Sequence, residues 1–139
     1  MAVALSDKTR MFLCEEHFAV LCTFNADGSP LLTTMWYFME DDGTIVMNSQ
    51  TRLQKVKNVH RDPRIAVNIH EGNRSVSING TAELSEDPTI VRDDLEHLIR
   101  RYVKDEATRE QYRSVFSSQP RTALRLKAEK LRTFSIEEN

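Results

Sequence analysis

The sequence predicts one mainly β domain with some α structure (α+β): a small, closed or partly closed barrel of six or seven antiparallel strands with peripheral helices. Six or seven strand-forming segments are separated by short turns, and few segments have helical spacing. The 139 residues, 40% of them apolar, suffice for one hydrophobic core over residues 1–139. Since closing a sheet removes its exposed edges, a barrel is favoured over an open sheet.

The first half of the chain predicts a short helix followed by a three-stranded antiparallel meander. Ser6 can cap the helix, which extends to about Glu16. The segments 25–29 and 41–43 contain the Asp and Gly residues of tight turns. Strands are therefore expected at residues 17–24, 30–40 and 44–49.

The second half predicts a helix, a hairpin, two further helices and a final strand region. Pro63 ends the first of these helices, and Asp87-Pro88 begins the second. Gly80 is expected at a bulge or bend. The expected helices are 50–62, 88–103 and a weaker one at 107–116; the strands are 64–71, 74–85 and one bent strand or two short ones in 121–136.

Charge and composition exclude several classes of function. The 19 basic and 21 acidic side chains give a net charge of −2, which disfavours a nucleic-acid binder. No long apolar run and no signal sequence is seen, so we expect a cytoplasmic protein without a membrane partner. Two cysteines and four scattered histidines have no metal-ligand spacing, so no metal site is expected.

Residues 48–58 are the segment most indicative of function. Ser49 and Thr51 end a predicted strand, and Arg52, Lys55 and Lys57 lie at the start of the next helix. Hydroxyls, free backbone N–H groups and cations at a helix start together can bind a phosphate or carboxylate. The alternative is that these cations form the solvated face of a surface helix. Their position favours an anion, since cations at a helix start oppose the helix dipole.

The predicted strand 30–40 carries the only Trp of the chain, Trp36. Strand alternation would place Thr34, Trp36 and Phe38 on one face, and Thr33, Met35 and Tyr37 on the other. The Thr hydroxyls could contact a polar heterocycle, whereas the alternative is that the aromatic rings are core residues. No sequence signature of a covalent nucleophile or a nucleotide-binding loop is present, so no catalytic side chain is assigned.

Several segments resemble the pyridoxamine 5'-phosphate oxidase-like split β-barrel family, whose members bind FMN or the deazaflavin coenzyme F420. They occur in the family's order over residues 5 to 136, and the most specific is the run from Lys55-Val56-Lys57-Asn58 to Asp62-Pro63-Arg64. The matching segments are Ala19–Thr23, Asp27–Pro30, Thr34–Tyr37, Asp42–Ile45, Lys55–Val67 and Gly80–Leu84. The resemblance implies an FMN-binding split barrel that forms homodimers with the cofactor between subunits.

The resemblance also assigns cofactor-binding positions. Those that match phosphate-binding residues are Ser49, Thr51, Lys55 and Lys57; those that match the strand lining the ring are Thr33, Thr34, Met35 and Trp36; Asn48, Gln50, Arg52 and Asn58 lie in the same cofactor motif. The chain departs from the family at Lys57, where relatives often carry Arg, and at Thr133-Phe134, where many have Trp.

The resemblance implies an oxidoreductase in which the cofactor performs hydride transfer and the protein positions it. The short chain and its version of the motif favour coenzyme F420 as cofactor, with a small planar organic acceptor as substrate. FMN is the alternative cofactor, since its phosphate would use the same donors. A non-catalytic flavin-binding protein and a plain interaction domain are the competing hypotheses, since fold alone does not define function.

Overall fold

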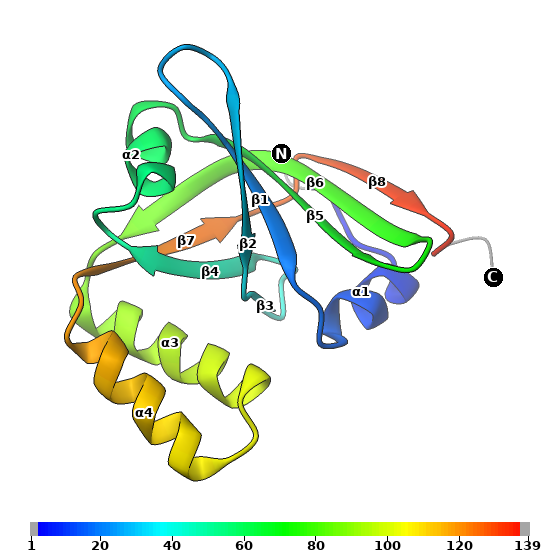
Figure 1. Ribbon diagram of the computed structural model, residues 1–139. Helices are drawn as coiled ribbons and strands as arrows, with labels where there is room; N and C mark the ends of the chain where they lie inside the picture. The colour runs from blue at the N-terminus through cyan, green and yellow to red at the C-terminus, as the bar shows by residue number, and fades with distance from the viewer. Residues whose placement is uncertain (1–2, 137–139) are drawn as a thin grey trace.

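The computed structural model describes residues 3–136, which form one curled sheet with four helices around it (Figure 1). The strands are β1 (Ala19–Phe24), β2 (Pro30–Met35), β3 (Phe38–Met39), β4 (Ile45–Gln50), β5 (Arg64–Glu71), β6 (Arg74–Ser85), β7 (Arg121–Leu126) and β8 (Lys130–Phe134). The helices are α1 (Asp7–Cys14), α2 (Gln54–Arg61), α3 (Pro88–Tyr102) and α4 (Glu106–Ser117). The predicted element order and mainly β class are confirmed.

The sheet is antiparallel throughout and curls on itself as a split barrel. Its hydrogen-bonded path is β2-β1-β5-β6-β7-β4-β3, and β8 pairs with the first half of β6. The two ends of this path, β2 and β3, are joined by only Trp36 and Tyr37. Because so short a connection keeps the two ends of the path together, the sheet has to close into a barrel-like shape.

The predicted strand 30–40 is interrupted, which divides it into β2 and β3. The backbone N–H of Tyr37 donates to the Tyr102 hydroxyl at 3.1 Å, and that hydroxyl lies 3.0 Å from the Tyr37 carbonyl oxygen. A side chain of α3 thus replaces a neighbouring strand at this point. The alternation itself is confirmed: Met35 and Tyr37 face the main core, and Trp36 and Phe38 the opposite side.

Helix α2 begins at Gln54, four residues later than the expected helix 50–62. The Thr51 N–H donates to the carbonyl of Pro120 at 2.9 Å, which holds residues 51–53 in a turn beside the start of β7. Other helix starts are as predicted, since Ser6 caps α1 and Asp87 caps α3. The tail forms two short strands, β7 and β8.

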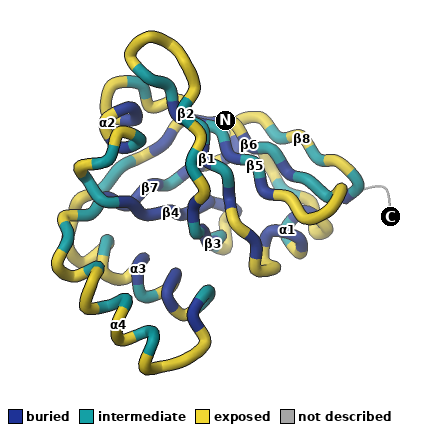
Figure 2. The backbone as a smooth tube through the Cα atoms, viewed as in Figure 1, coloured by how far each residue is buried: buried dark blue, intermediate teal, exposed yellow. Residues whose placement is uncertain are grey.

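Two hydrophobic clusters hold these elements together. The larger one fills the barrel and includes Leu21, Tyr37, Met47 and Leu124, all fully buried. The smaller one joins Phe38 and Val46 of the sheet to Leu98 of α3, so α3 packs on the outer side of β4 and β7. Helix α4 has no buried residue and is joined to the fold mainly through α3 (Figure 2).

Gly80 is not at a bulge, because β5 and β6 stay in register through this position. Its requirement is steric: a Cβ atom there would lie 2.4 Å from the carbonyl oxygen of Lys127 and 2.7 Å from the Leu126 side chain. The glycine therefore permits the close approach of β6 to the connection between β7 and β8.

We predict that Gly80→Ala lowers the free energy of unfolding by about 2–4 kcal/mol, because backbone atoms have to move to admit the methyl group. Gly28→Ala is the matched control. It has φ +87° but no atom near its Cβ position, so we expect a loss of about 1 kcal/mol. Urea unfolding of both variants measures the difference, and equal losses would contradict the steric explanation.

Candidate functional site

A cleft lies between the outer side of β4 and β7, the end of β2 and the α3–α4 hairpin; we call it the sheet–helix cleft. Asn48 and Gln50 lie on the same side of β4 as Val46, which faces α3. The cleft encloses about 250 Å³ and is open to solvent. It is lined by Thr34, Met35, Trp36, Asn48, Ser49, Gln50, Leu53, Lys55, Leu95, Leu98, Tyr112, Phe116 and Arg121.

The cleft brings together seven of the twelve predicted cofactor residues, namely Thr34, Met35, Trp36, Asn48, Ser49, Gln50 and Lys55. These residues come from three separate segments of the chain, at the end of β2, along β4 and at the start of α2. The sequence-based grouping therefore corresponds to one physical location.

The other five predicted residues do not line this cleft. Thr33 lies on the opposite side of β2 from Thr34, and Thr51 hydrogen-bonds Thr122 at 2.8 Å between the two hydroxyls. Arg52 and Lys57 are exposed beside α2, with the Arg52 Nε donating to Gln50 Oε1 at 3.1 Å. Arg52 and Lys57 are therefore positioned to contact a ligand only where it extends beyond the cleft.

Asn58, the fifth of these residues, is fully buried, and its hydrogen bonds stabilise the fold. Its amide nitrogen donates to Thr23 Oγ1 at 3.1 Å and to Asn25 Oδ1 at 2.9 Å. Its amide oxygen accepts from Gln54 Nε2 at 2.9 Å. Asn58 thereby fixes α2 to the end of β1, and both of its polar atoms are occupied.

Two half-buried cations, Lys55 and Arg121, dominate the electrostatics of the cleft. Lys55 Nζ lies 3.2 Å from Met35 Sδ, and Arg121 Nε donates to Asn48 Oδ1 at 2.8 Å. Within residues 3–136, neither cation has a carboxylate within ion-pair distance.

Burial lowers the pKa of Lys55, and the nearby charge of Arg121 lowers it further. Burial also lowers the pKa of Arg121, to about 10. Both shifts mean that each positive charge is less stable here than in water. An anion bound between the two side chains would relieve this cost, so the cleft is suited to a phosphate or carboxylate group.

Two buried polar atoms in this region have no hydrogen-bond partner: the Asn48 amide nitrogen and the Thr33 hydroxyl. Asn48 is only 7% exposed and lines the cleft, while its amide oxygen is already held by Arg121. A buried donor without a partner is costly. The Asn48 N–H groups are therefore available to an acceptor atom of a ligand, such as a heterocycle carbonyl.

Aromatic rings form one wall of the cleft. The Trp36 ring stacks on Tyr102 with centroids 4.9 Å apart, and it is tilted by 55° against Tyr112 at 5.3 Å. The Arg121 guanidinium carbon lies 4.4 Å from the centroid of Phe116. This wall offers flat apolar surface next to hydrogen-bond donors and cations, which suits a planar heterocycle with an anionic substituent.

The sequence analysis missed the residues supplied by the second half of the chain. Arg121 belongs to an alternating apolar and basic tail, and its pairing opposite Gln50 could not be predicted without the sheet order. Tyr112 and Phe116 are four residues apart in α4 and therefore share one helix face, a pattern that was visible in the sequence. The other missed lining residues are Leu53, Leu95 and Leu98.

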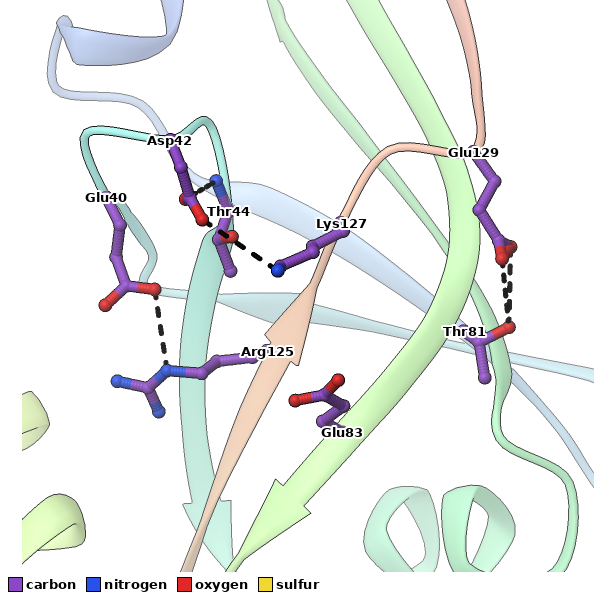
Figure 3. Close-up of a pocket in the computed structure, with 8 residues that line it drawn as sticks. All are labelled: Glu40, Asp42, Thr44, Thr81, Glu83, Arg125, Lys127 and Glu129. Atoms are coloured by element: carbon purple, nitrogen blue, oxygen red, sulfur yellow. Dashed lines mark hydrogen bonds and ion pairs between the residues drawn. The ribbon is translucent and has the colours of Figure 1, made fainter. Parts of the chain in front are cut away.

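A second, more polar pocket lies beside the β3–β4 turn and the β7–β8 connection (Figure 3). It encloses about 410 Å³, but four carboxylates and only two cations line it. Arg125 and Lys127 are directed at Glu40 and Asp42, as Figure 3 shows. Arg125 also forms a two-pronged ion pair with the buried Asp94 of α3, at 2.8 and 2.9 Å. The excess of carboxylates over cations makes this pocket unsuited to a phosphate.

One group of potential metal ligands occurs among the described residues, formed by Glu15, His17 and Glu71. The guanidinium of Arg74 already pairs with both of these carboxylates, and His17 Nε2 lies 3.0 Å from Glu15. The arrangement is that of an ion-pair network that fastens the end of α1 to the β5–β6 hairpin. No metal is assigned to it.

No helix within residues 3–136 combines the length and apolar character needed to cross a bilayer.

Comparison with known proteins gives the following relationships. A sequence profile described as Pyridoxamine 5'-phosphate oxidase matches residues 5–135. The chain is similar to the crystal structure of the conserved hypothetical protein Rv2991 from Mycobacterium tuberculosis, with 26% identity and a TM-score of 0.81, over 98% of this chain and 88% of that one. No curated protein sequence matches.

Two further structures show that this fold occurs in proteins of different description. One is named F420 reductase, with 19% identity and a TM-score of 0.72, over 92% of this chain and 98% of that one. The other is HutZ, the heme storage protein from Vibrio cholerae, with 14% identity and a TM-score of 0.73, over 96% and 97%. At these identities the likeness concerns the fold alone.

We predict that Asn58→Ala lowers the free energy of unfolding by about 1–3 kcal/mol, since it leaves Thr23 and Asn25 without their buried partner. Lys57→Ala, one residue earlier and exposed, is the control and should change stability by less than about 0.5 kcal/mol. Thermal or urea unfolding measures both. An Asn58→Ala protein as stable as the control would disprove the structural role.

Proposed function

The chain belongs to the pyridoxamine 5'-phosphate oxidase family, and we propose that it is an oxidoreductase that holds a flavin-type cofactor in the sheet–helix cleft. The preferred cofactor is the deazaflavin coenzyme F420, and FMN is the alternative. The observation that carries the proposal is the pair of half-buried cations, Lys55 and Arg121, without carboxylate partners at one end of an aromatic-lined cleft.

The residues of the cleft fit such a cofactor in chemical type. Lys55 and Arg121 would hold its phosphate, and the free amide nitrogen of Asn48 would donate to an oxygen or nitrogen of its ring system. Trp36 and Tyr112 would contact the flat face of the ring. The bound cofactor supplies hydride transfer to or from an organic acceptor, and no side chain of this cleft is required as a covalent catalyst.

F420 is preferred because of the cations outside the cleft. Arg52, just before α2, and Lys57, on α2, are exposed, and neither has an ion-pair partner among the residues that the structure describes. The acidic tail of F420 would extend from the phosphate toward them, whereas FMN ends at its phosphate. The proposed substrate is a small planar molecule that reaches the open face of the ring.

A homodimer is part of this proposal. The sheet–helix cleft encloses about 250 Å³ and is open, whereas sites for drug-sized ligands measure about 300–1,000 Å³ and bury most of the ligand. One chain therefore covers only part of a flavin-type cofactor. A second copy across the open side would complete the enclosure.

The test is a titration of FMN and of F420, followed by the fluorescence of Trp36, the only Trp of the chain. We expect Lys55→Ala and Arg121→Met each to lower the affinity for both cofactors roughly 10- to 100-fold. This is the effect of losing one hydrogen bond to a charged group. Lys57→Ala should lower the affinity for F420 but not for FMN. The Lys55→Ala/Lys57→Ala double variant should not bind F420 measurably.

Lys130→Ala, exposed on β8 and remote from the cleft, is the control and should leave both affinities unchanged. Unchanged binding in Lys55→Ala and Arg121→Met would disprove the assignment of the cleft. Turnover of the reduced cofactor with artificial quinone or nitro acceptors then separates an enzyme from a protein that only binds the cofactor.

A further inference from the structure

A third and larger cleft lies between α3 and α4, at the end of the helical hairpin away from its connecting turn; we call it the hairpin cleft. It encloses about 820 Å³, which lies in the range of sites for small organic molecules. Its apolar lining residues are Pro88, Val91, Leu95, Ile99, Phe116 and Pro120. None of the residues predicted to bind the cofactor lines it except Thr51.

The apolar surface of the hairpin cleft is a consequence of how α4 is attached. Helix α4 has no buried residue, so its inner face does not close on α3. Arg113 instead spans the gap, with its Nε 2.7 Å from one carboxylate oxygen of Glu96 and its second terminal nitrogen 2.9 Å from the other. This bridge holds the helices together and leaves a cleft between them, lined by the buried Leu95 and Ile99 and the partly exposed Val91 and Phe116.

The cations that line the hairpin cleft are paired with carboxylates, with one exception among the described residues. Arg113 contacts Glu96, Glu106 and Glu110 at 2.7 to 2.9 Å, so its charge is fully compensated. At the rim, Glu86 lies 3.7 Å from His60, and Arg92 lies 3.6 Å from Asp93.

Arg121 is the exception. Within residues 3–136 it is the cation lining this cleft that has no carboxylate partner. Its Nε and one terminal nitrogen donate to Asn48 and to Gln119, at 2.8 and 2.5 Å, and its plane rests on Phe116. A guanidinium has five N–H donors, so donors remain for a ligand. A half-buried positive charge at the end of an apolar cleft is complementary to an amphipathic anion.

We propose that the hairpin cleft binds a small organic anion, with an apolar body between α3 and α4 and a single carboxylate or sulfonate on Arg121. Leu95, Phe116 and Arg121 line both clefts, so the anionic end of this ligand would lie next to the sheet–helix cleft. The proposal stands on the hairpin cleft alone and does not rest on the proposed cofactor.

The test uses two fluorescent probes with the same apolar body, on the protein freed of any bound flavin. 1-Anilinonaphthalene-8-sulfonate carries one negative charge, and N-phenyl-1-naphthylamine carries none. We expect the anionic probe to bind at least 10-fold more tightly than the neutral one. Arg121→Met should remove this preference while changing the affinity of the neutral probe less than threefold.

Ser114→Phe blocks the cleft without altering the fold, because Ser114 is exposed on α4 and lines the hairpin cleft but not the sheet–helix cleft. This variant should lower the affinity for both probes at least 10-fold. Its affinity for FMN should equal that of the unmodified protein. Gln111→Phe, at an exposed position of α4 that lines neither cleft, is the matched control and should change nothing.

Two results would overturn the proposal. Probe binding that is insensitive to Ser114→Phe would place the probes elsewhere on the protein. An unchanged preference for the anionic probe in Arg121→Met would remove the role of Arg121 in this site. Failure of FMN to bind would count against the proposed function alone, since neither probe requires a cofactor.

Discussion

The attachment of α3 to the outer side of the sheet determines where the two clefts lie in this protein. The Tyr102 hydroxyl lies 2.5 Å from the His17 carbonyl oxygen and also bonds the backbone of Tyr37. Tyr102 thereby separates β2 from β3, and Trp36 stacks on its ring. The buried ion pair of Asp94 with Arg125 fixes the middle of the helix. Both clefts depend on this packing, because α3 lines each of them.

The second determinant is electrostatic. Many cations in residues 3–136 have carboxylate partners, as in the network of Arg113 with three glutamates. Lys55 and Arg121 do not, although both are half-buried and their pKa values are lowered by that burial. A folded protein that retains such charges in a cleft has given up stability there, and this is typical of a binding site. The contrast also explains why the acid-rich pocket near Arg125 is not the proposed site.

Sequence reasoning predicted the helix positions and the order of elements, because turn residues and apolar periodicity are local signals. The expected three-stranded meander is divided, since strand 30–40 splits into β2 and β3, which lie at opposite ends of the sheet path. The same reasoning grouped Lys55 with the end of β4, and the structure brings these residues to one cleft, whose role as a cofactor site is the proposal made above. Asn58 lay in the right motif, but its buried contacts to Thr23 and Asn25 depend on the packing of α2. Arg121 could not be predicted at all, since it reaches the cleft only through the pairing of β7 with β4. Long-range strand pairing leaves no local trace in the sequence.

We propose that Lys55 and Arg121 together hold the anionic end of a flavin-type cofactor. A comparison of FMN with riboflavin measures this directly, since the two molecules differ only in the phosphate. Titration of each by the fluorescence of Trp36 should give FMN an affinity roughly 100-fold or more above that of riboflavin, as expected for charge-assisted contacts to two cations. Equal affinities, or no binding of either, would show that Lys55 and Arg121 do not hold the phosphate of such a cofactor.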